Sequence, residues 1–261
     1  MKKEEIKITP QWSKSKDEIW NDMFEELEDT PKVIQMQPRR KSVWMYVAAA
    51  VAAIVILLPS IAFLYTKSET AGRGSHLAVV LPDGSKVDLN ADSKITYKPL
   101  WWKISRNVQL QGEAYFEVKK GSKFDVRSGD YTVSVLGTSF NIFARADKYS
   151  VTCLTGKVSV ADKATSVVLT PNMQAMIDNH QLKTAAIQNT QEAISWKDGK
   201  FIFVSVPLVE VIQEIERQYD INVLPQSNLD YLYSGNFTKE QKPDDVLKIV
   251  GKPFGIDLKM K

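Results

Sequence analysis

The chain of 261 residues has one cysteine and two histidines. The single cysteine, Cys153, excludes an internal disulfide, so the folded parts must rely on their hydrophobic cores. Its setting in VTCL is typical of a small buried apolar residue rather than a reactive thiol. Neither His76 nor His180 has a second ligand at a metal-binding spacing, so the sequence predicts no metal site and no cofactor.

Charge patterns and catalytic patterns are also sparse. The net charge of +3 is small and evenly mixed, which argues against a nucleic-acid partner. The GRG run at 72–74 lacks the third glycine and the preceding strand of a nucleotide-binding fingerprint. Glu113 and Glu117 share one face of a predicted strand, where paired carboxylates are usually solvated. Glu210 and Glu214 form an ordinary polar helix face. These patterns predict no enzyme.

The sequence does contain a long apolar run, WMYVAAAVAAIVILLPSIAFLY at 44–65. As a helix it would be roughly 33 Å long, close to the ~30 Å hydrocarbon core of a bilayer. A buried core helix would carry a polar face, which this run lacks. A cleaved signal peptide is the alternative, since Ser60 and Ala62 form a small-x-small site, but its apolar run would be only about 7 to 15 residues. The sequence therefore predicts a retained transmembrane helix.

The basic residues around this run predict its orientation. Arg39, Arg40 and Lys41 directly precede it, whereas Lys67 and the more distant Arg73 follow it. Under the positive-inside rule, the end with more basic residues stays in the cytoplasm. We therefore expect a cytoplasmic N-terminus and an ectodomain across the membrane.

The cytoplasmic segment, residues 1–43, contains one predicted amphipathic helix in WSKSKDEIWNDMFEELED at 12–29. Seven acids in this stretch oppose two lysines. Ser15 and Glu18 have the spacing of a capping box, and Thr30-Pro31 supplies a stop. The apolar side chains fall on one helical face and are predicted to bind a partner: Ile19, Trp20, Met23, Phe24 and Leu27.

A helix this short is marginally stable alone, so its apolar face needs a surface to fold against. The inner surface of a membrane is anionic and favours Lys and Arg, and DNA phosphates also select cations. Both fit an acidic helix poorly. A basic protein surface that normally meets DNA or polymerase fits the acids and the aromatic anchors better.

The pattern beyond the apolar run is of the β type. A polar, glycine-containing stretch at 66–76 is predicted to be a linker. Short runs of alternating apolar residues follow, separated by turn signals such as Pro82-Asp83-Gly84. They predict an all-β domain at 77–170, and a connector with few strong signals at 171–195.

The last part of the chain, residues 196–261, alternates strand and helix patterns in the order β-α-β-β-α-β. Pro207 and Pro243 can each open a helix with an apolar side. The predicted fold class is a membrane-anchored chain with a single transmembrane helix, an all-β domain and a small α+β domain.

Three segments resemble a known family. LPDGSKVDLNADSKITY at 81–97, VQLQGEAYFEV at 108–118 and VLGTSFNIFA at 135–144 are similar to the signature segments of the FecR family of membrane-anchored anti-sigma factors. The C-terminal region resembles the short secretin and TonB N-terminal type of domain. One departure is Asn172, where relatives have Pro-Gly, but Asn tolerates the left-handed backbone of such a turn.

The resemblance implies a single-pass protein of the inner membrane with a periplasmic C-terminus. It implies three partners: an extracytoplasmic-function sigma factor in the cytoplasm, the signalling domain of an outer-membrane TonB-dependent transporter in the periplasm, and a membrane-embedded protease. We expect a partner strand to add to an exposed sheet edge of the α+β domain. Most motif residues are predicted to be structural, through tight turns, close packing and core positions: Leu81, Pro82, Asp83, Gly84, Ser85, Leu89, Asn90, Gly112, Glu113, Phe116, Gly137, Thr138 and Phe140.

Gly137 and Thr138 have a second interpretation. Some members of the family that this chain resembles cut themselves at the corresponding Gly-Thr bond, where the hydroxyl attacks the preceding carbonyl carbon. The alternative is a turn between strands that the core requires. No base for the cleavage is evident in the sequence.

Two other functions stay open. The chain is compatible with a membrane-tethered periplasmic module that binds glycan or peptidoglycan, with an incidental cytoplasmic tail. A periplasmic hydrolase would need a nucleophile and a base that the sequence does not reveal.

Overall fold

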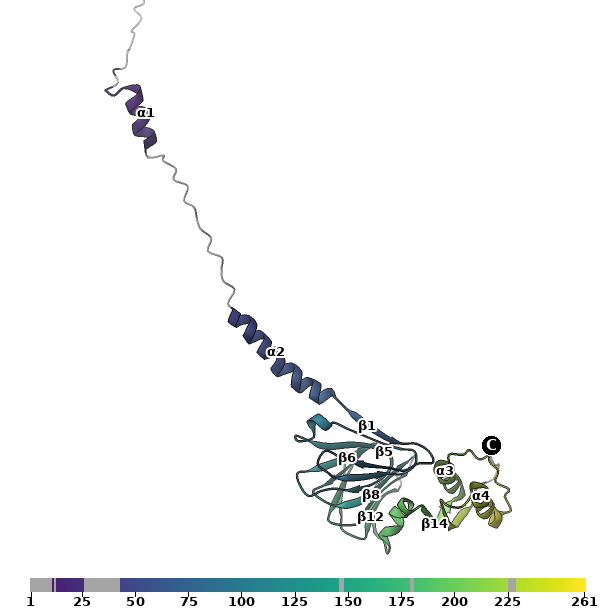
Figure 1. Ribbon diagram of the computed structural model, residues 1–261. Helices are drawn as coiled ribbons and strands as arrows, with labels where there is room; N and C mark the ends of the chain where they lie inside the picture. Colours follow the sequence, from purple (N-terminus) through teal and green to yellow (C-terminus); the bar gives the residue numbers. More distant parts are fainter. Residues whose placement is uncertain (1–10, 12, 26–42, 146–147, 179–180, 225–228) are drawn as a thin grey trace, which may run out of the picture. The chain divides into compact units, whose positions relative to one another are not determined.

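The computed structural model describes residues 11, 13–25, 43–145, 148–178, 181–224 and 229–261 (Figure 1). The N-terminal elements are α1 (Lys16–Phe24) and α2 (Val43–Leu64). The β domain contains β1 (Lys67–Ala71), β2 (Leu77–Val80), β3 (Lys86–Leu89), β4 (Ser93–Tyr97), η2 (Pro99–Trp101), β5 (Arg106–Glu117), β6 (Phe124–Ser128), β7 (Tyr131–Val135), β8 (Ser139–Arg145), β9 (Lys148–Cys153), β10 (Val158–Ala161), β11 (Ser166–Leu169), β12 (Met173–Asp178) and β13 (Gln181–Ala186). The C-terminal domain contains η3 (Thr190–Asp198), β14 (Lys200–Pro207), α3 (Leu208–Tyr219), β15 (Leu232–Thr238), α4 (Pro243–Gly251) and η4 (Lys252–Phe254).

Helix α1 begins where the sequence predicts. Ser15 is the N-cap, its hydroxyl accepts from the Glu18 backbone N–H, and the Glu18 carboxylate accepts from the Ser15 N–H at 2.9 Å. Both arms of the predicted capping box are therefore confirmed. Leu27 and the Thr30-Pro31 stop lie outside the described residues.

Helix α2 covers nearly all of the predicted transmembrane run. By length and composition it is the one helix, within the described ranges, that is apolar enough to cross a membrane. Pro59 lies inside the helix, and the Ser60 hydroxyl donates to the Ile56 carbonyl at 2.7 Å. A serine bond of this kind helps to satisfy the backbone near a proline in an apolar setting.

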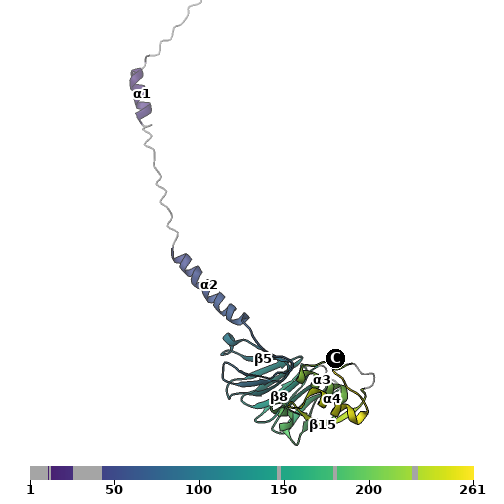
Figure 2. The same cartoon turned by 45° about the vertical axis from the view of Figure 1, so that its right-hand side comes forward.

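The β domain consists of two sheets that share the long strand β5 (Figures 1 and 2). The first half of β5 pairs with β4 and β6, and the second half pairs with β3 and β8. One core of buried side chains collects residues from both sheets, and the Phe116 and Phe140 rings stack in it with centroids 5.0 Å apart.

Gly112 marks the point where β5 passes from one sheet to the other. Its φ is +94°, which side chains rarely adopt, and a Cβ there would lie 2.5 Å from Ser93 Oγ and 2.8 Å from the Asp92 carbonyl oxygen. Gly112 thus lets the two backbone segments approach closely. Asn172 also has the left-handed conformation that we expected, with a φ of +66°.

The β domain extends beyond the boundaries that the sequence suggested. Residues 67–71, in the predicted linker, form β1, which pairs with β4 at the edge of a sheet. The polar KSETA pattern hides this strand because only Ala71 is buried and the pairing uses the main chain. Strands β12 and β13 occupy the first part of the predicted connector, and β12 pairs with β9.

The C-terminal domain matches the predicted α+β order only in part. Helices α3 and α4 bury the predicted apolar faces and pack against β14 and β15 (Figures 1 and 2). The second and fourth strands of the predicted order fall at 221–224 and 255–260, and in the structure these segments form a single bridge between Val223 and Met260. Two backbone hydrogen bonds, from Leu224 N to Lys259 O and from Lys261 N to Asn222 O, hold these segments together, so the ladder is too short to form strands.

Candidate functional site

The three signature segments converge on one buried carboxylate, that of Glu113. Asn90, from the first segment, donates through Nδ2 to Glu113 Oε2 at 2.8 Å. Asn141, from the third segment, donates through Nδ2 to Glu113 Oε1 at 2.9 Å. Glu113 is 6% exposed, so the predicted solvated position of this side chain is wrong. The C-terminal domain covers this face of β5, which strand periodicity alone does not reveal.

Burial dominates the electrostatics of Glu113. Loss of solvent, followed by the repulsion of the Glu214 carboxylate, raises the pKa of Glu113 to about 7. The hydrogen bond from Asn141, the charge of Arg145 and the hydrogen bond from Asn90 oppose this rise in the pKa. The carboxyl group therefore changes its charge near neutral pH.

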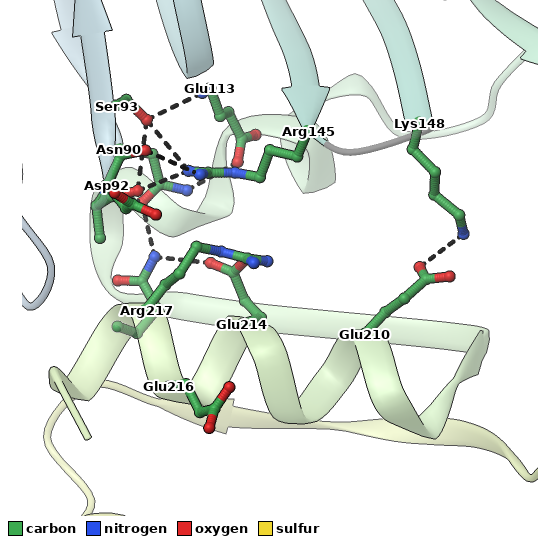
Figure 3. Close-up of polar contacts among 12 residues, drawn as sticks. Asn90, Asp92, Ser93, Glu113, Arg145, Lys148, Glu210, Glu214, Glu216 and Arg217 are labelled. Carbon is green, nitrogen blue, oxygen red and sulfur yellow. Dashed lines mark hydrogen bonds and ion pairs between the residues drawn. The ribbon is translucent and has the colours of Figure 1, made fainter. Parts of the chain in front are cut away.

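Helix α3 of the C-terminal domain supplies the other side of the site (Figure 3). Gln218 is fully buried and donates through Nε2 to Asn90 Oδ1 and to Glu214 Oε1, both at 2.7 Å. The Arg217 guanidinium holds the second oxygen of Glu214, with Nη2 at 2.6 Å and Nε at 3.1 Å. A continuous chain of hydrogen bonds thus runs from Glu113 through Asn90 and Gln218 to Glu214.

Arg145 fixes the turn that carries Asn90 (Figure 3). Its Nη2 donates to the Ala91 carbonyl at 2.6 Å and to Ser93 Oγ at 3.1 Å, and its Nη1 donates to the Asp92 carbonyl at 3.0 Å. Ser93 Oγ also accepts from the Glu113 backbone N–H at 2.9 Å. Arg145 therefore joins the end of β8 to the turn and to the start of β4, and Ser93 extends the contact to β5.

The segment between β1 and β2 contacts the end of α3. Arg73 Nη2 donates to the Glu216 carbonyl at 2.9 Å and to the Ile221 carbonyl. The Gly74 N–H donates to the Arg217 carbonyl at 2.7 Å, and His76 Nε2 lies 3.0 Å from Gln218 Oε1. A guanidinium at the C-terminal end of a helix satisfies carbonyls that have no partner within the helix. The sequence predicts only a linker at this GRG run, because no local pattern signals a distant helix end.

Two ion pairs lie at the rim of the same interface. Lys148 Nζ is 2.6 Å from Glu210 Oε2 (Figure 3), and Lys197 Nζ is 2.7 Å from Asp88 Oδ2. Lys197 also lies over the Tyr115 ring, 4.0 Å from its centroid. Partly exposed pairs of this kind typically contribute up to about 1 kcal/mol each, so they add specificity more than stability.

The remaining motif residues lie in turns and in the core of the β domain. Asp83 accepts from the Ser85 N–H at 2.9 Å, and Arg106 donates to Asp83 Oδ2 at 2.8 Å. The pKa of Asp83 is lowered, because its hydrogen bonds from Ser85 and Arg106 outweigh the opposing effect of burial. Gly84 has a φ of +79°, and Pro82 is exposed beside it. The apolar members are buried in the core: Leu81, Leu89, Phe116 and Phe140.

Gly137 and Thr138 lie between β7 and β8, in a groove that Leu136, Lys120 and Lys157 also line. A Cβ on Gly137 would lie 2.7 Å from the Lys120 Cα, so the backbones approach closely here. Thr138 is 5% exposed, and its hydroxyl has no hydrogen-bond partner among the described residues. This geometry fits the structural interpretation of Gly137, and it leaves the Thr138 hydroxyl free.

The predicted sigma-binding face lies on α1. Trp20 is 60% exposed, Met23 is 59% exposed and Phe24 is 39% exposed, whereas Ile19 is half-buried. The Trp20 and Phe24 rings lie 4.4 Å apart between centroids. Four of the five predicted residues therefore lie on the described helix.

No three His, Cys, Asp or Glu side chains within the described ranges are grouped closely enough to hold a metal ion. The polar site around Glu113 is made of carboxylates, amides and guanidinium groups that pair with one another. Such an arrangement can hold two domains together and can respond to a change of charge.

Comparison with known proteins agrees with the signature segments. Residues 67–159 match the family described as FecR protein, and residues 200–261 match the one described as FecR, C-terminal. Together the two matches cover more than half of the chain. The chain belongs to the FecR family.

Solved structures are similar as well. A crystal structure at 2.50 Å resolution of a "putative anti-sigma factor" from Parabacteroides distasonis ATCC 8503 is 29% identical, with a TM-score of 0.67, and the match covers 74% of this chain and 93% of that chain. A second structure, under the same description and at 1.65 Å resolution, has a TM-score of 0.66 at 29% identity, with 73% and 92% covered. No curated protein matches the chain. The family and these neighbours support a regulatory role.

Sequence reasoning missed four residues of the site: Arg73, Asn141, Glu214 and Gln218. Asn141 stands inside a signature segment, and an Asn within an otherwise apolar strand is a signal for a buried polar contact. Gln218 follows Glu214 by four residues on α3, so both lie on one helical face. Nothing local to the sequence relates that face to Glu113.

Proposed function

We propose that this protein is a membrane-anchored anti-sigma factor that holds an extracytoplasmic-function sigma factor through α1. The observation that carries the proposal is the exposed aromatic face of this acidic helix. Helix α1 precedes the apolar helix α2 in the chain, and the FecR-type domains follow α2. An acidic helix with Trp20 and Phe24 as anchors complements a basic surface of the kind that meets DNA or polymerase.

The proposed orientation places α1 in the cytoplasm and both FecR-type domains in the periplasm, with α2 crossing the inner membrane. The basic cluster before α2 supports it under the positive-inside rule.

A phosphatase reporter that works only outside the cytoplasm tests this orientation. Fused after Lys261, it should be active, whereas the same reporter fused after Lys41 should be inactive. A stable but inactive Lys261 fusion would show that the C-terminus stays in the cytoplasm, and would contradict the scheme.

On the periplasmic side, we propose that the C-terminal domain reads the signalling domain of an outer-membrane TonB-dependent transporter. Its two-stranded sheet carries exposed apolar side chains: Ile202 at 45%, Val204 at 72% and Leu232 at 62%. Strand addition to such a sheet gives affinity through main-chain hydrogen bonds. Among the described strands β14 pairs with β15 alone, which supports its other edge as the point of entry.

The contacts around Glu113 and Arg73 support a route for the signal. A partner that displaces α3 would break the Gln218 bond to Asn90 and the Arg73 bonds to the end of α3. Arg73 is two residues past the end of β1, the strand next to the membrane helix. Loss of these bonds would loosen the chain near the membrane, where a membrane-embedded protease acts in this proposal.

Self-cleavage at Gly137-Thr138 is an additional step that we propose on the basis of the free Thr138 hydroxyl. The hydroxyl oxygen would attack the Gly137 carbonyl carbon, the C–N bond would break with the proton passing to nitrogen, and water would hydrolyse the resulting ester.

If this step occurs, freshly expressed protein should separate into two fragments in denaturant. Thr138→Ala should then run as one chain, and Thr138→Ser, which keeps a hydroxyl, should still be cut. An uncut wild-type chain would remove the step, and release would depend on separate proteases alone.

The alternative is a periplasmic glycan-binding module. The feature that favours it is a groove of about 1210 Å³ between the β domain and α3, lined by side chains that include Gln111, Phe143, Gln174 and Glu210. A pull-down with residues 1–43 separates the two proposals. The anti-sigma proposal expects a sigma factor to be recovered, whereas the glycan-binding proposal expects none.

A further inference from the structure

The loop between β4 and β5, residues 98–105, presents apolar side chains to solvent. Leu100 is 62% exposed and Ile104 is 69% exposed, and Trp101 between them is half-buried. Lys98 and Lys103 are the two basic residues of the loop. Large apolar side chains clustered with lysines on one loop indicate a surface that meets an apolar partner with anionic groups.

The loop is held in a defined shape. Trp102 is 4% exposed, and its ring packs edge-on against Tyr97 and Phe124, with centroids 5.7 Å and 5.8 Å away. Backbone bonds close the turn, from Ile104 N to the Trp101 carbonyl at 3.0 Å and from Ser105 N to the same oxygen at 3.1 Å. Trp102 therefore anchors the loop in the core while its neighbours stay outside.

The strand register places this loop beside the membrane helix. Helix α2 ends at Leu64, and β1 begins at Lys67, only three residues later. β1 runs antiparallel to β4, with Lys67 opposite Tyr97. The residues after Tyr97 must then lie at the end of the sheet from which α2 departs.

Side-chain contacts agree with the register. The ring of Phe63, near the end of α2, lies 5.4 Å from the Trp101 ring between centroids. Lys98 Nζ lies 3.5 Å from the centroid of the Phe63 ring. The loop thus lies at the level where α2 would leave the hydrocarbon region.

We propose that residues 98–105 dock into the interface of the same bilayer that α2 spans, with Leu100 and Ile104 among the upper acyl chains. Tryptophan side chains favour the headgroup level of a bilayer, and Trp101 would lie at that level. Lysine side chains extend their amines to lipid phosphates, as Lys98 and Lys103 would here. This inference rests on the proposed membrane insertion of α2. Docking would fix the β1–β4 edge against the membrane and so orient the periplasmic domains.

The test uses the full chain in nanodiscs of phosphatidylethanolamine and phosphatidylglycerol. Single cysteines, Leu100→Cys or Ile104→Cys, carry a fluorescent label, while the natural Cys153 is fully buried and stays unlabelled. Val204→Cys, 72% exposed on the C-terminal domain, is the matched control for an exposed apolar position. Ile56→Cys, in the middle of α2, reports whether the helix itself is inserted.

We expect nitroxide-bearing lipids to quench the labels at 100 and 104 several-fold more than the label at 204. Aqueous iodide should show the opposite order. Labels at 100 and 104 that iodide reaches as readily as position 204, while the label at 56 is quenched by lipid, would overturn the docking and leave the anchor intact. A label at 56 that iodide reaches would instead overturn the membrane insertion. The nanodisc contains no other protein. A loop that binds a protein partner in cells, and not lipid, would therefore leave the labels at 100 and 104 as accessible to iodide as the label at 204, which is the first contradicting result.

Discussion

Replacing Trp20 and Phe24 together by alanine is expected to release the sigma factor and to switch its target genes on without inducer. Trp20 is 60% exposed and Phe24 is 39% exposed, so neither ring supports a core within the described residues. Buried aromatic anchors at an interface commonly contribute about 2 kcal/mol or more each. Loss of both would weaken binding by roughly a thousandfold if the two effects add.

A reporter gene driven by the sigma factor measures this effect, with an immunoblot to show that the variant is made. Asn21→Ala is the matched control, because Asn21 is an exposed polar residue of the same helix. The control should leave repression intact. Full repression by a stably expressed double variant would rule out this helix as the inhibitor.

Glu113→Gln is expected to remove a pH dependence from the stability of the two FecR-type domains. The pKa of Glu113 in the folded protein is raised to about 7 from an ordinary value of 4.5. The stability that the protonated carboxyl contributes is therefore fully present below about pH 4.5, and it is lost as the pH rises through about 7. The loss amounts to about 3 kcal/mol. Glutamine has nearly the same shape and stays neutral, so the variant should become more stable than the wild type above pH 7.

Urea unfolding of residues 66–261 at pH 5 and at pH 8 measures this difference. The advantage of the variant should grow by about 2 to 3 kcal/mol between the two conditions. Glu117→Gln is the control, since Glu117 is exposed on the same strand and should change little. If the free energy of unfolding changes equally between pH 5 and pH 8 for wild type and Glu113→Gln, then Glu113 keeps an ordinary pKa and the buried interface opens in solution.

Local signals predicted the helical parts of this protein well. The capping box of Ser15 and Glu18 depends on neighbours three residues apart, and it is present in the structure. The apolar faces of α3 and α4 likewise follow from spacing within each helix. Such features need no knowledge of distant residues.

Features that depend on distant residues were missed. Strand β1 lies at an edge, so its pattern is polar and its pairing with β4 comes from the main chain. Glu113 seemed solvated because strand periodicity does not show that α3 covers that face of β5. Arg73 was assigned to a linker because its partners lie more than 140 residues further along the chain.

The signature segments contain three residues of the site, but they do not show that these residues meet or that Asn141 takes part. Asn90, Glu113 and Asn141 come together only through the register of β3, β5 and β8, in which Tyr115 of β5 lies between Asp88 and Asn141. The resemblance therefore gave the family correctly, while the structural role of these polar residues depends on long-range pairing.

Site-specific photo-crosslinking in cells tests the central claim most directly. A photoreactive amino acid at Met23, 59% exposed on the aromatic face of α1, is compared with the same group at Asp22. Asp22 lies off the aromatic face, about 100° around the helix from Met23, and pairs with Lys14 at 2.5 Å. We predict a crosslink from position 23 of the full-length chain to a sigma factor, and a much weaker one from position 22. Crosslinks from position 23 to lipid alone, or to proteins without any sigma factor among them, would contradict the account.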